Sequence, residues 1–272
     1  MPGLQVTVQT SAIWQMTSTI LRSGASCLVV DPGYFPREIQ ELTGRIPRRA
    51  TVEALVFTHS HWDHVVGHGP FPGVPAYASP VLVSSVAEGG ELARAALTRA
   101  KGFDGQWYVE RPWGYGWPRD LRALDDGDWF NVGDADVQAL LLPGHAPDCL
   151  GIVAKNHLLV GDYLSPCEIP FVDCLEDYRR TLRRLLVVID GAIDTVVPGH
   201  GLVLPAARAR GIALEDLRYL TAIRRCAESG DADAALATPL PRAADVPGMR
   251  DHHLENCRKA GLSVPAPSTA LD

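Results

Sequence analysis

The stretch Ala54-Leu-Val-Phe-Thr-His-Ser-His-Trp-Asp-His64 joins an apolar run to four potential metal ligands within six positions. The apolar run is typical of a buried strand. Because side chains alternate along a strand, His59 and His61 point to the same side. Asp63 and His64 then face a second point. Imidazole and carboxylate groups are ligands for zinc, and iron or manganese also accept them, so the stretch predicts a metal site.

Three more ligand types stand where apolar runs end later in the chain. His145 follows a Pro-Gly pair, Asp162 follows a glycine, and His200 lies in a Pro-Gly-His-Gly sequence. Asp31 also ends an apolar run, where an aspartate either caps a turn or supports metal ligands through hydrogen bonds. These residues strengthen the prediction of a metal site, because ligands at strand ends can converge at one edge of a sheet.

Hydrophobic periodicity predicts strands in groups, with helices interleaved irregularly between them. The strand candidates are residues 4–8, 17–22, 27–30, 54–57, 74–78, 134–142, 150–154, 157–160 and 194–197. Helices are expected at 36–46, in two short pieces within 79–100, after an N-cap and capping box formed by Asp173 and Glu176, through 225, and at 251–260. This order favours two sheets with helices outside them.

The chain has 272 residues, 46% of them apolar, and a formal net charge of -7. We expect one domain over residues 1–262 and a flexible tail over 263–272. The acidic balance argues against a nucleic-acid surface. The start lacks a signal-peptide pattern and no apolar run reaches membrane-spanning length, which favours a soluble cytoplasmic protein. The six scattered cysteines are expected to be buried thiols.

In order and context, the ligand residues resemble the five-motif pattern of the metallo-β-lactamase fold hydrolases. The matching sequences are His59-x-His-x-Asp-His64, His145 after Pro-Gly, Asp162 after Gly, and His200 in Pro-Gly-His-Gly, with Asp31 at the first motif. The resemblance spans roughly residues 1–205. It implies an α/β fold, an αββα sandwich of two mixed sheets with helices on the outer faces and metals at one sheet edge.

The resemblance also implies that the ligands hold two zinc ions, with iron or manganese as the alternative. By this resemblance, the first ion is held by His59, His61 and His145, and the second ion by Asp63, His64 and His200. Asp162 would bridge the two ions. Two cations about 3.5 to 4 Å apart activate a shared water as hydroxide. The hydroxide would attack the acyl carbon of an ester, thioester or lactone, while Asp63 steers its proton.

The same superfamily includes thioesterases, lactonases, nucleases and iron-dependent sulfur oxygenases, so the ligands do not define the substrate. A metal-dependent hydrolase of a small-molecule acyl ester, thioester or lactone is the leading interpretation. The first alternative is a mononuclear iron enzyme similar to persulfide dioxygenases, which retain most of this ligand pattern. The second is an N-acyl homoserine lactonase. Those lactonases often have a tyrosine three positions after the bridging aspartate, where this chain has Ser165, and Tyr163 would point away from Asp162.

Five further residues are candidates for substrate contacts, namely Trp113, Tyr115, Trp117, His252 and His253. The three aromatic residues belong to a loop over 107–118, and their rings either line an apolar pocket wall or pack on the core. The two histidines lie in a predicted C-terminal helix, which in this superfamily often closes over the site. His68 and His157 are expected to be ordinary surface or turn residues.

Overall fold

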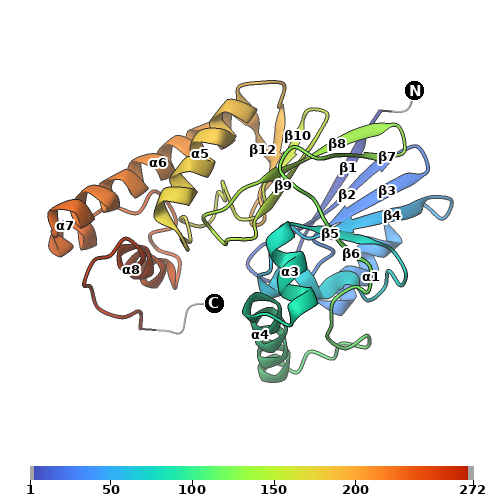
Figure 1. Cartoon of the computed structure of the whole chain (residues 1–272), viewed down its shortest axis with the longest axis horizontal. Coiled ribbons are helices and arrows are strands. Elements are labelled where there is room, and N and C mark those ends of the chain that lie inside the picture. Colours follow the sequence, from blue (N-terminus) through green and yellow to red (C-terminus); the bar gives the residue numbers. More distant parts are fainter. Residues whose placement is uncertain (1–2, 269–272) are drawn as a thin grey trace.

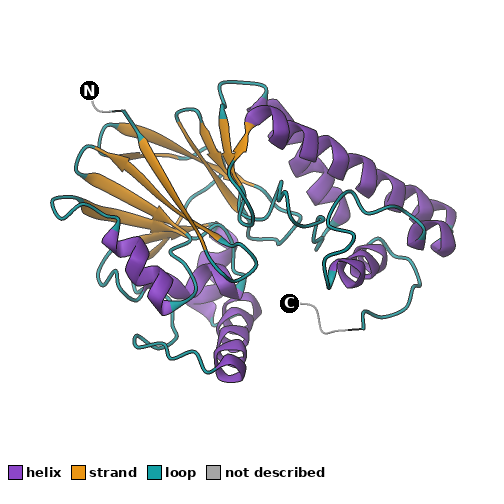
Figure 2. Ribbon diagram, turned by 180° about the vertical axis from the view of Figure 1, so that it is seen from behind, coloured by secondary structure: helices purple, strands orange, loops and turns teal. Residues whose placement is uncertain are grey.

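Two six-stranded sheets lie face to face, and helices cover the outer face of each (Figures 1 and 2). The computed structural model describes residues 3–268. Each sheet is mixed, because it contains both parallel and antiparallel neighbours. The αββα sandwich predicted from the sequence is therefore confirmed.

The first sheet holds its strands in chain order. They are β1 (Gln5–Thr10), β2 (Thr17–Ser23), β3 (Ser26–Val30), β4 (Thr51–Val56), β5 (Ala76–Ala78) and β6 (Leu121–Ala123). β1, β2 and β3 are antiparallel neighbours, whereas β3 to β6 run parallel. A parallel pair needs a crossover, which α1 (Pro36–Gly44) supplies between β3 and β4. The carboxyl ends of these two strands therefore meet at one edge.

The second sheet has the order β12-β11-β10-β9-β8-β7. Its strands are β7 (Trp129–Val132), β8 (Ala135–Leu141), β9 (Leu150–Ala154), β10 (His157–Leu159), β11 (Thr195–Val197) and β12 (Leu204–Pro205). β10 and β11 are parallel, and α5 (Leu175–Ile189) provides their crossover. β9 and β10 form the predicted hairpin, which turns at Lys155, a residue with positive φ.

The other helices fall into two sets, one for each sheet. On the side of the first sheet lie α2 (Trp62–Val65), the 3-10 turn η1 (Val66–His68), α3 (Pro80–Glu88) and α4 (Glu91–Trp107). On the side of the second lie α6 (Ala206–Ser229), α7 (Ala232–Leu236) and α8 (Met249–Lys259), with α6 running beside α5 in Figure 1. Across the described part of the chain, no helix is long and apolar enough to cross a membrane.

The apolar core has three layers, and strand alternation distributes side chains between them. Cys27 and Val29 of β3 pack toward α1 to α4, whereas Leu28 and Val30 pack toward the second sheet. A third cluster fills the space between the second sheet and helices α5 to α8. Because both faces of β3 are covered, its sequence is a continuous apolar run.

The predicted N-cap of α5 is wrong. The helix begins at Leu175, and Cys174 holds the cap position without a side-chain hydrogen bond. Asp173 instead accepts a hydrogen bond from Lys259 at 2.7 Å. The carboxylate of Asp173 therefore pairs with Lys259, a residue far along the chain, and does not cap α5.

Several other expectations also differ from the structure. Trp107 ends α4 and does not belong to the following loop. The prediction that the cysteines are buried is wrong for three of them, because Cys174 is exposed and Cys167 and Cys226 are half-buried. Of the predicted flexible tail, Ser268 donates a hydrogen bond to Asp251, and residues 269–272 lie outside the described part.

Candidate metal centre

The predicted ligands lie at one edge of the sandwich, on segments that follow strands. His59 and His61 come after β4, His145 after β8, Asp162 after β10 and His200 after β11. Because β10 and β11 run parallel, the segments after them start at the same edge. The sequence pattern of a ligand after each apolar run therefore translates directly into convergence in space.

The last two ligands, Asp63 and His64, lie on the first turn of α2. His61 is the extended N-cap residue of that helix, with φ -61° and ψ 142°. The change from extended to helical backbone at this point turns the next side chains away from His59 and His61. Asp63 and His64 therefore face a second point, as the sequence predicts.

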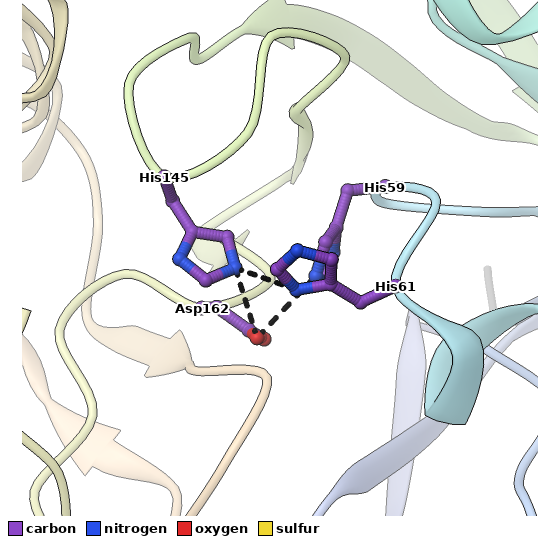
Figure 3. Close-up of side chains that lie close together, drawn as sticks. All are labelled: His59, His61, His145 and Asp162. Carbon is purple, nitrogen blue, oxygen red and sulfur yellow. Dashed lines mark hydrogen bonds and ion pairs between the residues drawn. The ribbon is translucent and has the colours of Figure 1, made fainter. Parts of the chain in front are cut away.

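The first ligand group comprises three imidazoles and one carboxylate: His59, His61, His145 and Asp162 (Figure 3). The Nε2 atoms of His59 and His145 each lie 3.3 Å from Oδ2 of Asp162. His145 Nε2 also lies 3.0 Å from His61 Nδ1. Each residue offers one ligand atom, and these atoms lie within 4.8 Å of one another.

The second group comprises Asp63, His64 and His200. Oδ2 of Asp63 lies 3.5 Å from His64 Nε2 and 3.4 Å from His200 Nε2. Asp162 joins this group to the first, because its Oδ1 atom lies 3.4 Å from His64 Nε2 and its Oδ2 atom 3.4 Å from His200 Nε2. Asp162 thus lies between the two groups of candidate ligands.

The donor set fits a pair of metal ions. His59 Nε2 and Asp162 Oδ1 are buried and have no hydrogen-bond partner in the protein. A buried polar atom without a partner is unfavourable unless a water or an ion satisfies it. The imidazole nitrogens that lie 3.0 and 3.3 Å apart also have the spacing of two ligands about 2.0 to 2.1 Å from one tetrahedral ion. Three imidazoles with carboxylate match the ligands that zinc and iron prefer.

Hydrogen bonds behind the ligands fix the orientation of their rings. Asp31 lies 2.8 Å from His64 Nδ1 and also accepts from the N–H and hydroxyl of Thr58. His145 Nδ1 donates to the carbonyl of Phe171 at 2.9 Å, and His200 Nδ1 donates to the carbonyl of Trp14 at 2.9 Å. Because a carbonyl only accepts, the Nδ1 atoms of these two rings carry the proton, and Nε2 presents its lone pair to the centre.

The glycines beside the ligands are required by close contacts. A Cβ at Gly199 would overlap the Asp162 carboxylate and the backbone of Gly161. Gly144, with φ 132°, packs against the backbone of Tyr178 at the start of α5, where a side chain would overlap it. These contacts explain the Pro-Gly pairs that precede His145 and His200.

The electrostatics of the site favour neutral rings at His59 and His61, a charged ring at His64 and an ionised carboxylate at Asp162. Burial lowers the pKa of His59 and His61, which keeps both rings in the neutral form that binds metal. Burial opposes ionisation of Asp162, but His200 and His64 beside it hold its pKa well below the usual range. Burial likewise opposes protonation of His64, yet the surrounding carboxylates raise its pKa to about 9. The site therefore stabilises positive charge, as a cation site must.

Comparison with known proteins agrees with this geometry. The family model described as the metallo-beta-lactamase superfamily matches residues 13–200. The chain belongs to this superfamily. The matched segment contains every candidate ligand of both groups, whereas α6, α7 and α8 lie beyond it.

Among curated members of the superfamily, two illustrate what the chain resembles. It is 28% identical over 184 residues to a probable polyketide biosynthesis zinc-dependent hydrolase of Bacillus velezensis, covering 66% of this chain and 69% of the relative. It is 30% identical over 208 residues to the human acyl-coenzyme A thioesterase MBLAC2, covering 66% and 71% of the two chains. Both relatives are named as hydrolytic enzymes.

A solved metallo-beta-lactamase family protein from Thermus thermophilus shares the fold. Its TM-score is 0.65 at 20% identity, and the alignment covers 96% of this chain and 95% of that one. Another solved structure, in a di-iron-bound form, gives a TM-score of 0.55 at 22% identity, with 74% and 96% covered. Both likenesses agree with the metallo-beta-lactamase fold.

Two cavities open beside the ligands. The apolar cavity, of about 420 Å³, is lined by Trp14, Trp62, Phe171, Val246 and Met249 together with Asp63, Asp162 and His200. The basic cavity, of about 500 Å³, is lined by Arg99, Arg258 and Lys259 together with Asp173, Glu255, His61 and His145. No sequence pattern places Trp14 or Phe171 here, although Trp62 lies inside the ligand stretch itself.

The structure places the predicted aromatic residues Trp113, Tyr115 and Trp117 away from both cavities. All three pack against the core around the first sheet. Their polar atoms bind core groups: Trp113 Nε1 donates to the carbonyl of Val66 at 3.0 Å, and the Tyr115 hydroxyl donates to Asp104 at 2.7 Å. The core-packing alternative therefore describes these rings, and they line neither cavity.

The two predicted histidines of α8 have different positions. His252 lines both cavities. His253 is buried, and its Nδ1 atom lies 2.8 Å from the hydroxyl of Tyr219. Of the histidines expected to be ordinary, His68 lies near the carbonyl of Val65, and His157 starts β10. Only His252 of the α8 pair is therefore placed to meet a substrate.

Proposed function

We propose that this protein is a metal-dependent hydrolase that cleaves acyl thioesters or related acyl esters. The observation that carries the proposal is the position of Asp162 between two complete ligand groups. When bound, a pair of divalent cations supplies Lewis acidity, which lowers the pKa of water and polarises an acyl oxygen. Hydrolysis is the reaction that this chemistry serves best.

Asp63 is the residue that we assign to the proton of the attacking water. Its carboxylate lines the apolar cavity beside the ligands of both groups. Burial opposes its ionisation, but His64 and His200 hold its pKa below the usual range. The carboxylate therefore accepts hydrogen bonds, and it can orient a water molecule toward the cavity.

The substrate class rests on the apolar cavity and on the named activities of relatives. Trp14, Trp62 and Met249 offer an apolar surface directly beside Asp63 and Asp162. Burial of an acyl group there gains about 25 cal/mol for each Å² removed from water. Two relatives are named as thioesterases, one for acyl-coenzyme A and one for an acyl carrier protein. An acyl thioester agrees with both lines of support.

A sulfur oxygenase with a single iron is the competing candidate. The observation in its favour is that His59, His61, His145 and Asp162 form a complete group for one ion. The lactonase alternative has less support, because the Tyr163 hydroxyl accepts a hydrogen bond from the backbone N–H of His145 and lies behind that ligand.

Metal analysis of the purified protein, combined with a substrate panel, separates these candidates. Our proposal predicts about two zinc, iron or manganese ions per chain and hydrolysis of acyl thioesters. One iron per chain with oxygen uptake on a persulfide would support the oxygenase. Lactone hydrolysis without thioester hydrolysis would replace our substrate class by the lactonase class.

A further inference from the structure

The two cavities meet at the metal ligands. His61, Phe171 and His252 line both of them. A substrate whose reacting bond lies at this junction therefore extends in two directions, with one arm in each cavity. A thioester has this form, because the acyl group and the thiol carrier leave the reacting carbon on opposite sides.

The apolar cavity is suited to the acyl arm and not to an anionic carrier. Aromatic and aliphatic side chains make up much of its wall, and none of the described residues that line it is Lys or Arg. It also contains Glu168, whose carboxylate lies 3.8 Å from His200 Nδ1. A phosphate group in this cavity would face that carboxylate without a cationic side chain to bind it.

The basic cavity has the opposite character. Arg99 of α4 and Arg258 and Lys259 of α8 line it, against two carboxylates, Asp173 and Glu255. These three cationic side chains gather at one cavity, although the net charge of the chain is -7. The grouping of cationic side chains at this cavity does not follow from the overall composition.

The two cations that α8 contributes to this cavity form exchangeable surface contacts. Lys259 Nζ lies 2.7 Å from Asp173, with the two side chains 38% and 45% exposed. Arg258 lies 3.6 Å from Glu255, with similar exposure. Exposed ion pairs contribute little to stability, and an anionic phosphate group competes well for such side chains.

We propose that the basic cavity binds the phosphate-bearing pantetheine arm of a thioester, while the apolar cavity holds the acyl group. This inference rests on the thioester activity proposed above. Coenzyme A and acyl carrier proteins share the phosphopantetheine arm, so the chemistry that Arg258 and Lys259 recognise is the same for both.

A series of thioesters with one acyl group tests the proposal. The acyl-pantetheine carries no phosphate, the acyl-phosphopantetheine carries one, the acyl-coenzyme A carries more, and an acyl carrier protein presents the arm on a protein. We expect kcat/KM to rise by about tenfold or more from the first to the second, the factor for one charge-assisted contact. A further rise with only coenzyme A or only the carrier protein identifies the natural source.

Variants assign this effect to the cavity. We expect Arg258→Gln combined with Lys259→Gln to lower kcat/KM for the phosphate-bearing thioesters by about tenfold and to leave acyl-pantetheine unchanged. Arg250→Gln is the matched control, because Arg250 lies on the same helix, is exposed and lines neither cavity. Calorimetric titration with coenzyme A and with pantetheine gives the same comparison without turnover.

The failures of the two proposals are distinct. If no thioester of the series is hydrolysed, the proposed function is wrong and the inference falls with it. If all are hydrolysed at equal kcat/KM, or if the double variant affects acyl-pantetheine as strongly as acyl-coenzyme A, the hydrolase stands and the phosphate site is wrong.

Discussion

The ring of His252 stacks on that of Phe171, with centroids 3.5 Å apart and an interplanar angle of 12°. The carbonyl of Phe171 accepts the hydrogen bond of His145 Nδ1. A side chain of α8, which lies beyond the matched family segment, therefore contacts the residue that orients the candidate ligand His145. The C-terminal helix is thereby part of the wall of the site.

This arrangement predicts different effects for the neighbouring histidines of α8. We expect His252→Ala to raise KM several-fold with little change in thermal midpoint, because it removes the wall shared by the two cavities. We expect His253→Ala to lower the free energy of unfolding by about 1–3 kcal/mol, because the Tyr219 hydroxyl loses a buried partner. Steady-state kinetics measures KM and calorimetry measures the free energy of unfolding for both variants. The opposite assignment of effects would show that α8 does not cover the site as described.

Asp162→Ala should abolish activity while the fold persists. The carboxylate lies between both ligand groups, so its loss removes a ligand from each ion and the negative charge between two cations. We expect kcat to fall by more than about a hundredfold, beyond the effect of residues that only support ligands. Plasma mass spectrometry should show metal loss, and circular dichroism an unchanged spectrum. Two bound metals with near wild-type turnover would refute the bridging role.

His145→Ala should reduce metal content far more than His68→Ala. His145 Nε2 faces Asp162 at 3.3 Å, whereas His68 only lies near the carbonyl of Val65. Both variants remove an imidazole of the same size, so each serves as the control for the other. Metal counting after dialysis against buffer without metal decides the matter, and equal losses would mean that the ligand assignment is in error.

Trp113→Ala should reduce stability without changing substrate preference. Its ring packs on the core of the first sheet, and its Nε1 atom binds the carbonyl of Val66. We expect a loss of about 2–4 kcal/mol, less than for a fully buried tryptophan. Trp107→Ala is the control, because Trp107 is 61% exposed. Calorimetry measures the difference. A stable Trp113→Ala variant with raised KM for bulky substrates alone would show that Trp113 contacts the substrate and is not a core residue.

Trp14→Ala should have the reverse profile. Trp14 is 47% exposed and lines the apolar cavity, and its ring contacts that of Trp62 edge to face at 5.4 Å. We expect KM to rise several-fold for long acyl chains and little for acetyl, with a small change in thermal midpoint. A chain-length series of one thioester family provides the measurement. Equal changes for acetyl and long chains would exclude an acyl-binding role.

The convergence of the candidate ligands could be predicted from the sequence because His59, His145, Asp162 and His200 follow apolar runs, and strand ends converge at a sheet edge. His59, His145 and His200 all obey this rule. The supporting carbonyls of Phe171 and Trp14 could not be predicted, since every residue has a carbonyl and only the folded backbone selects one. The supporting role of Asp31 could be considered from the sequence, because its carboxyl group and its position at a strand end are both visible there.

The directions of side chains outside regular periodicity were the hardest to predict. Trp113 and Tyr115 lie two positions apart in a loop without regular structure, so no period indicates which side is buried. Their orientation depends on Val66 and Asp104, which belong to other segments. The same holds for Asp173, which the sequence pattern predicted as an N-cap but whose carboxylate instead pairs with Lys259.

Thr17 connects the two sheets beside the ligands. Its N–H donates to the carbonyl of Gly199 at 2.7 Å, and its hydroxyl donates to that of Pro198 at 2.6 Å, 181 positions along the chain. We expect contacts of such sequence separation to form late in folding, because the entropy cost of closing a loop grows with its length. Metal bound at His200 would then stabilise the contact between the two sheets after each sheet has formed. Slower amide exchange at Thr17 in the metal-loaded protein than in the stripped protein would reveal that coupling.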